Sequence, residues 1–151
     1  HIMLDNIFFV RHVAFNKGEN KPNKNGLLQL DKLSSKIHRD NLLFNKIISS
    51  SGPLSIFTAE KIIEVNDFSN QLIINDLYLK KKNEITDFSK ILSKVRGLKL
   101  NTLIITNGEF IYNFLKFLYE NKITKNNPIT LERGECYFIQ FKGNEVLLDT
   151  Y

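Results

Sequence analysis

The sequence predicts an α/β fold, a three-layer α/β/α sandwich with a mostly parallel central sheet and a C-terminal β-hairpin. Short apolar segments alternate with amphipathic segments along most of the 151 residues. This order of strands and helices is typical of a largely parallel sheet. Near the end of the chain, two strand-like segments flank Lys142-Gly143-Asn144, which predicts a hairpin added to that sheet.

The first half of the chain alternates between predicted strands and helices. Apolar residues recur at helical spacing from Leu27 to Ile37, which indicates one face of an amphipathic helix. Ser, Gly and Pro between residues 49 and 53 mark the loop after the second strand. The expected strands are residues 4–10, 44–48 and 71–74, and the expected helices are residues 27–39 and 58–65.

The second half continues the pattern. Helical spacing from Ile85 to Val95 predicts a helix that stops at Gly97. Residues 102–106 are almost wholly apolar, as expected for a central parallel strand covered on both faces. A strongly apolar helix follows, from Phe110 to Leu118, and the predicted hairpin strands are residues 135–141 and 145–148.

Length and composition predict one domain. A chain of 151 residues with 42% hydrophobic residues can bury a continuous core. We expect this domain to span residues 3–151, because His1-Ile2 ahead of Met3 resemble residues added for expression. No apolar run is long enough to cross a bilayer and no signal peptide is evident, so a cytoplasmic protein without a membrane partner is expected.

The cysteine and the basic residues limit the kinds of binding site that the chain can form. Cys136 is the single cysteine, so neither an internal disulfide nor a cysteine-based metal site is available, and we expect the thiol to pack in the core. We also expect no metal and no cofactor. The net charge of +5 comes from lysines scattered among Asn and Ile, a pattern of AT-rich coding that makes a nucleic-acid partner the least favoured reading. The four arginines, which suit bidentate oxyanion binding, are Arg11, Arg39, Arg96 and Arg133.

Polar residues follow three predicted strands at their carboxyl ends. Arg11-His12 follows the first strand, the loop from Ser49 follows the second, and Asn107-Gly108 follows residues 102–106. Ligands of open α/β sheets bind outside the carboxyl ends of the strands. A cation beside an imidazole at this edge predicts an anion site. The alternative is that the pair only faces water, as charged residues at strand ends often do.

Four segments carry a resemblance to a known family. They are F-V-R-H at residues 9–12, K-P-N-K-N-G at 21–26, S-S with T-A-E at 50–51 and 58–60, and L-I-I-T-N-G at 103–108. They are similar to motifs of the histidine phosphatase superfamily: R-H-G after a strand, a polar run ending N/E-G, S-S/P-x-x-R-x-x-Q-T-A-E, and V-x-V-S-H-G. In length and layout the chain resembles the SixA-type phosphohistidine phosphatases, which implies a phosphoglycerate mutase-like fold over nearly the whole chain.

The resemblance also implies roles for individual residues. His12 would be the nucleophile that carries a phosphoryl group as phosphohistidine, and Arg11 would clamp the phosphate. The partner would be a phosphorylated small molecule or a phosphoprotein. By position and residue type, Glu109 or Glu84 is the candidate acid for the leaving group.

The chain departs from the family pattern at phosphate-binding positions. Leu54 stands where the family has a second arginine, Asn107 where it has a second histidine, and Val13 where it has glycine. Lost donors and charge predict weak or absent phosphatase turnover, because one such donor contributes roughly 3–4 kcal/mol to a transition state. Arg133, or a lysine of the polar run from Asn16, is a candidate replacement; Asn16 and Asn107 are further candidate phosphate contacts.

Several of these residues have structural explanations as well. Asn107 is a good helix N-cap and Glu109 suits a first helical turn, while His38 is expected to be a surface imidazole. The alternative function is a non-catalytic module that binds a phosphorylated small molecule or a phosphotransfer partner. Oligomeric state stays open.

Overall fold

Strand β1 (Asn6–Arg11) lies inside a mixed sheet. The computed structural model describes residues 6–98 and 101–151; residues 4 and 5 of the predicted first strand, and His1-Ile2, lie outside this range. Within it the sheet has six strands. From edge to edge they are β3 (Leu72–Ile74), β2 (Lys46–Ser49), β4 (Thr102–Thr106), β1, β5 (Cys136–Lys142) and β6 (Glu145–Thr150).

The four strands β3, β2, β4 and β1 are parallel, and the hairpin β5–β6 is antiparallel. Arg11 pairs with Thr106 at the ends of β1 and β4, and Ser49 of β2 pairs with Ile105. The three strand ends that carry polar residues therefore meet at one edge. The predicted α/β sandwich, with its mostly parallel sheet and C-terminal hairpin, is confirmed.

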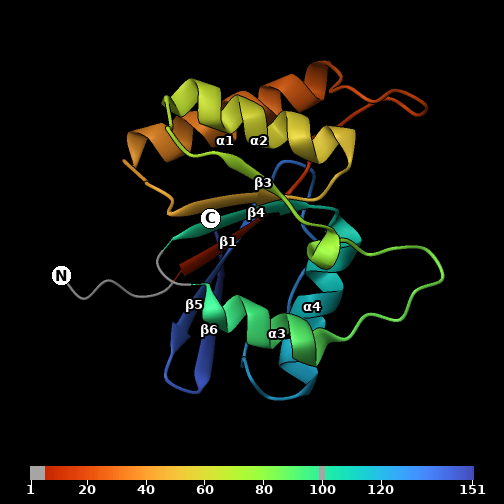
Figure 1. Cartoon of the computed structure of the whole chain (residues 1–151), viewed down its shortest axis with the longest axis vertical. Coiled ribbons are helices and arrows are strands. Elements are labelled where there is room, and N and C mark those ends of the chain that lie inside the picture. Colours follow the sequence, from red (N-terminus) through yellow and green to blue (C-terminus); the bar gives the residue numbers. More distant parts are fainter. Residues whose placement is uncertain (1–5, 99–100) are drawn as a thin grey trace.

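Two helical layers cover the sheet, with α1 (Lys24–Arg39) and α2 (Pro53–Asn66) on one face and α3 (Phe88–Gly97) and α4 (Gly108–Glu120) on the other (Figure 1). Strand β1 is buried on both faces because its side chains alternate. Phe8 and Val10 pack with residues of α1 and α2, whereas Ile7 and Phe9 pack with residues of α3 and α4.

Helices α1 and α2 begin earlier than the sequence predicted and α3 begins later, because of the residues at their N-termini. The helix expected from residue 58 begins at Pro53, because proline is favoured in the first helical turn. The helix expected from residue 27 begins at Lys24, where the Asn23 side chain caps it by accepting from the Gly26 amide. Ile85, expected in α3, lies in the preceding loop and is 98% exposed, since Asp87 caps the helix.

A short 3-10 helix, η1 (Asp76–Tyr78), follows β3 and leads into a loop toward α3. Tyr78 is buried, and its carbonyl accepts a hydrogen bond from the Thr106 hydroxyl. This contact fixes the start of the loop against the carboxyl end of β4. None of the helices in the described residues combines the length and apolar character that a bilayer crossing requires.

Candidate functional site

His12 follows β1 directly and is held by its neighbours. Its backbone amide donates to the Thr106 carbonyl oxygen at 3.1 Å, and its ring Nδ1 lies 3.2 Å from the Val13 carbonyl oxygen. A carbonyl oxygen can only accept, so this contact places the proton on Nδ1 and leaves the lone pair on Nε2. The half-buried ring packs against Phe15, with 5.7 Å between ring centroids.

Electrostatics favour the uncharged form of His12. Burial lowers the pKa of the imidazole below its usual range, the Val13 carbonyl acts in the opposite direction, and the Arg11 and Arg133 guanidinium groups lower the pKa further. A neutral imidazole with a free Nε2 is the nucleophilic form of histidine.

Arg11 crosses from β1 to the first turn of α4. Its Nη1 donates to the Leu131 carbonyl oxygen, and its Nε is buried without a partner among the described residues. A Cβ added to Gly108 would lie 2.6 Å from that Nε, so glycine permits this approach. Burial and Arg133 lower the pKa of Arg11 while Glu132 raises it, and the guanidinium stays charged at neutral pH. Arg11 and the helix amino terminus together offer an electropositive corner.

Arg133 reaches the same region from the segment before β5. Its guanidinium carbon lies 5.0 Å from the centroid of Phe15, the ring that also contacts His12. The backbone amide of the next residue, Gly134, donates to the Arg11 carbonyl oxygen at 3.0 Å. The structure thus brings Arg11, His12 and Arg133 together. The Phe15 ring stabilises the Arg133 guanidinium through a cation–π contact.

The start of α2 forms another wall. The Thr58 hydroxyl donates to the Leu54 carbonyl oxygen at 2.7 Å and lies 3.5 Å from the Val13 amide nitrogen as an acceptor. Leu54 and Thr58 are four residues apart on one helical face. The half-buried Leu54 side chain therefore lies one turn nearer the edge of the sheet that carries His12, and it is apolar.

Asn107 acts as the cap of α4. Its Oδ1 accepts from the Phe110 amide at 3.1 Å, and its Nδ2 donates to the Lys80 carbonyl oxygen at 3.4 Å. Both halves of the carboxamide thus have protein partners. The capping explanation agrees with this geometry, and a contact from Asn107 to phosphate stays a prediction.

The two candidate acids lie in different places. Glu109 is exposed in the first turn of α4, next to the Gly108 that Arg11 crosses. Glu84 lies in the loop after η1, where its backbone carbonyl accepts from the Lys80 ammonium at 2.8 Å. No hydrogen bond or ion pair between described residues joins either carboxylate to His12.

Asn16 lies in the exposed polar loop after β1. Its Oδ1 accepts from the Asn23 side chain at 3.2 Å, and its carbonyl oxygen accepts from the Glu19 amide at 3.0 Å. These bonds shape the loop around the cap of α1. A phosphate contact from Asn16 stays a prediction.

Sequence reasoning missed two residues that shape this edge. Asp76 accepts from the Ser51 amide at 2.7 Å and from the Ser51 hydroxyl at 2.8 Å, and these bonds lower the pKa of Asp76. Asp76 could have been found from its place just after β3, because the carboxyl end of β3 lies at the same edge of the sheet. Phe15, which joins His12 to Arg133, gave no signal because aromatic residues are common throughout the chain.

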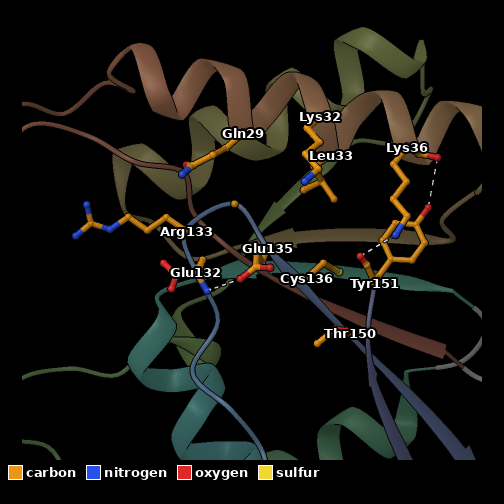
Figure 2. Close-up of a pocket in the computed structure, with 11 residues that line it drawn as sticks. Gln29, Lys32, Leu33, Lys36, Glu132, Arg133, Glu135, Cys136, Thr150 and Tyr151 are labelled. Atoms are coloured by element: carbon orange, nitrogen blue, oxygen red, sulfur yellow. Dashed lines mark hydrogen bonds between the residues drawn. The ribbon is translucent and has the colours of Figure 1, made fainter.

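A cavity of about 430 Å³ lies between α1 and the start of β5. Figure 2 shows Arg133 at one end, pointing away from Cys136 and Tyr151. At the other end the Lys36 ammonium donates to the Tyr151 carbonyl oxygen at 2.8 Å and lies 4.0 Å from the Tyr151 ring centroid. The cavity adjoins the candidate site at Arg133, but His12 is not part of its lining.

No metal cluster is evident near these residues: within residues 6–98 and 101–151, no three His, Cys, Asp or Glu side chains are grouped closely enough to hold an ion. Cys136 is buried, and burial raises the pKa of its thiol. The thiol therefore stays protonated and packs in the core.

No protein-family model matches the chain, and neither does any curated protein sequence. Solved structures do match. The protein histidine phosphatase SixA, complexed with tungstate, matches with a TM-score of 0.76 and 9% identity over 95% of this chain and 94% of that one. The chain has the histidine phosphatase fold.

Two other solved structures match this chain over nearly the whole length of both proteins. A phosphoglycerate mutase from Bacillus anthracis str. Sterne gives a TM-score of 0.76 at 10% identity, covering 98% of this chain and 92% of that chain. A phosphoserine phosphatase mutant from Entamoeba histolytica, in complex with phosphoserine, gives 0.70 at 12% identity, covering 96% and 95%. At these identities the likeness shows the fold, which confirms the predicted phosphoglycerate mutase-like architecture.

Proposed function

We propose that this chain is a divergent histidine phosphatase that binds a phosphoryl group at Arg11, His12 and Arg133 and transfers it through His12 with slow turnover. The observation that carries the proposal is the state of His12. Its Nδ1 faces the Val13 carbonyl, which leaves the lone pair on Nε2, and the charges of two guanidinium groups act on the ring. A protein of the same fold, the protein histidine phosphatase SixA, is complexed with tungstate, a tetrahedral oxyanion, and we propose an oxyanion ligand for this chain too.

The proposed reaction has two displacements at phosphorus. The Nε2 lone pair forms an N–P bond as the bond from phosphorus to the leaving oxygen or nitrogen breaks, and the leaving group takes a proton from an acid. Water then attacks phosphorus and gives a proton back to the deprotonated acid, the N–P bond breaks, and phosphate leaves with neutral His12 restored. Arg11 and Arg133 offset the charge on the phosphoryl oxygens in both steps.

Glu109 fits the acid better than Glu84 does. It lies beside Gly108, over which the Arg11 side chain packs, so its carboxyl group can approach a phosphoryl group held by Arg11. Glu84 instead lines a separate cavity of about 440 Å³ with Asp76 and Lys81. We therefore infer that Glu109 is the proton donor.

Two features support slow turnover. Leu54 gives the first turn of α2 an apolar side chain, and Asn107 uses its carboxamide for the α4 cap and the Lys80 carbonyl. Neither residue adds positive charge to a phosphoryl group in transit. Each missing donor of this kind raises a barrier by roughly 3 kcal/mol.

Replacing His12 with alanine is expected to remove phosphoryl transfer. The protein is incubated with radiolabelled phosphoramidate, and label that is acid-labile and base-stable is measured, together with slow hydrolysis of p-nitrophenyl phosphate. His12→Ala removes the only proposed nucleophile, so both signals fall to background. His38→Ala is the matched control, since His38 is exposed on α1, and it keeps both. Equal labelling of His12→Ala and the parent protein would contradict the proposal.

The rate of His12 labelling is expected to stay constant on acidification from neutral pH and to fall only below pH ~6.5, the usual pKa of histidine. Burial and the charges of Arg11 and Arg133 lower the pKa of His12, so the neutral imidazole persists to more acidic pH. Single-turnover labelling across pH 5–8, with His12→Ala as the blank, measures the midpoint. A midpoint at or above the usual value overturns this electrostatic account.

A second candidate function is binding without turnover, as a module for a phosphorylated small molecule or a phosphotransfer partner. The engaged carboxamide of Asn107 favours it, because binding needs fewer donors than transition-state stabilisation does. Calorimetry with phosphoserine separates the two functions: binding that Arg11→Ala abolishes, with no labelling of His12, supports the module.

A further inference from the structure

A single peptide group connects His12 to helix α1. The carbonyl oxygen of this group belongs to Val13 and lies 3.2 Å from Nδ1 of His12. Its N–H belongs to Ala14 and donates to Oε1 of Gln29 on α1, with 2.9 Å between the nitrogen and the oxygen. Because a trans peptide group is planar, its carbonyl and its N–H point in opposite directions. Gln29 on one side therefore fixes the plane that the imidazole contacts on the other.

The hydrogen bond from Ala14 to Gln29 also strengthens the contact with the imidazole. A peptide group whose N–H donates a hydrogen bond is polarised, and its carbonyl oxygen becomes a better acceptor. A better acceptor at Val13 favours the proton on Nδ1 of His12, and the lone pair then stays on Nε2. The Gln29 side chain thus acts on the nucleophilic nitrogen through the peptide group.

The packing around Gln29 holds its side chain in place. Gly134 lies directly against it, since a Cβ added to Gly134 would be 2.7 Å from the Gln29 Cβ and 3.4 Å from its Oε1. The Gly134 amide in turn donates to the Arg11 carbonyl oxygen at 3.0 Å. Ala14 is held on its other side, where its carbonyl oxygen accepts from the Asn23 amide at 3.0 Å. The hydrogen bond between Gln29 and Ala14 therefore joins two segments that are each fixed independently.

We infer that Gln29 is a positioning residue for His12, which sets the tautomer and the direction of the imidazole through the peptide group between Val13 and Ala14. The inference rests on the proposed function where it concerns rate, since the tautomer affects phosphoryl transfer only if His12 is the nucleophile. Partners that orient a metal-bound imidazole contribute roughly 10-fold to 100-fold to activity. We expect the loss of the Gln29 oxygen to slow phosphoryl transfer by a similar factor.

Gln29→Met tests the role of the acceptor, because methionine keeps the length of the side chain and removes the oxygen. Long-range ¹H–¹⁵N spectra at pH ~8, where the imidazole is neutral, measure the share of each His12 tautomer, with His12→Ala to assign the signals. The variant is expected to lose part of the tautomer that carries its proton on Nδ1. It is also expected to label His12 at least ~10-fold more slowly.

Two further variants serve as controls. Gln29→Glu keeps an oxygen acceptor at the same reach and is expected to retain the Nδ1 tautomer. Lys32→Met introduces methionine at an exposed position about one turn further along α1, and is expected to change neither the tautomer nor the labelling rate. Urea unfolding gives the folded fraction of each variant, and labelling rates are divided by it so that a loss of stability is not counted as a loss of orientation.

The spectra and the labelling can fail separately. An unchanged tautomer in Gln29→Met overturns the inference, and so does an altered tautomer with an unchanged labelling rate. An equal change of tautomer in Lys32→Met also overturns it, because the effect would then belong to the helix and not to the acceptor. If the parent protein is not labelled at His12, the proposed function fails, whereas the spectra still decide whether Gln29 sets the tautomer.

Discussion

Replacing Gly26 with alanine is expected to lower the free energy of unfolding by about 3 kcal/mol. A Cβ at this position would lie 2.1 Å from the Ala14 carbonyl oxygen and 3.1 Å from the Pro22 Cβ. The carbonyl has little freedom to move, because it accepts from the Asn23 amide at 3.0 Å, and the Ala14 amide donates to Gln29 at 2.9 Å. The helix or the loop that carries His12 must shift.

Urea unfolding measures the loss, and Gly52→Ala is the matched control. Gly52 has nothing within 4 Å of an added Cβ and an ordinary φ of −61°, so alanine is expected to change stability by less than ~1 kcal/mol there. The Gly26 variant should also label His12 more slowly than its residual folded fraction accounts for. Equal stability of the two variants would show that α1 does not clamp the loop.

Replacing Phe114 with alanine is expected to cost about 4 kcal/mol of unfolding free energy. The side chain is 0% exposed, and its ring lies 5.8 Å from Phe9 and 6.1 Å from Phe110 between centroids. The Phe114 ring lies between α4 and the central strand β1. Because a helix and a strand of the close-packed core border the cavity that alanine would leave, they cannot move in to fill it.

Phe57→Ala serves as the control, since Phe57 is 38% exposed on α2 and should lose only about 1 kcal/mol. The two variants remove the same atoms, so the difference between them isolates burial. Thermal and urea unfolding measure both. A loss for Phe114→Ala no larger than that for Phe57→Ala would contradict the assigned core.

The strands of the sheet could be predicted because each is a short apolar run that is visible in the local sequence. Residues 103–105 are apolar and lie between two threonines, and the structure makes residues 102–106 the central strand β4, buried along its length. Arg11, His12 and Asn107 could be placed at one edge because parallel strands end together. The start of α2 was missed, since Ser, Gly and Pro read as a loop whereas Pro53 opens the helix.

The details of the site depend on contacts between distant segments. Asp76 holds Ser51 across 25 residues, and the Arg11 guanidinium meets the Leu131 carbonyl across 120. No periodicity in the chain encodes such pairs. The approach of Arg133 to His12 through Phe15 is of the same kind, and only the folded packing of the loop on the segment before β5 reveals it.

The central position of β1 has a consequence for how the protein acquires its structure. Val10 pairs with Ile105 on one side and with Cys136 on the other, so β1 finds its two neighbours only in segments far along the sequence. Pairings of such sequence separation slow folding. During synthesis, the strand that carries Arg11 and leads into His12 has both neighbours only after β5 has been made, and the candidate site is therefore assembled later than the helices packed beside it.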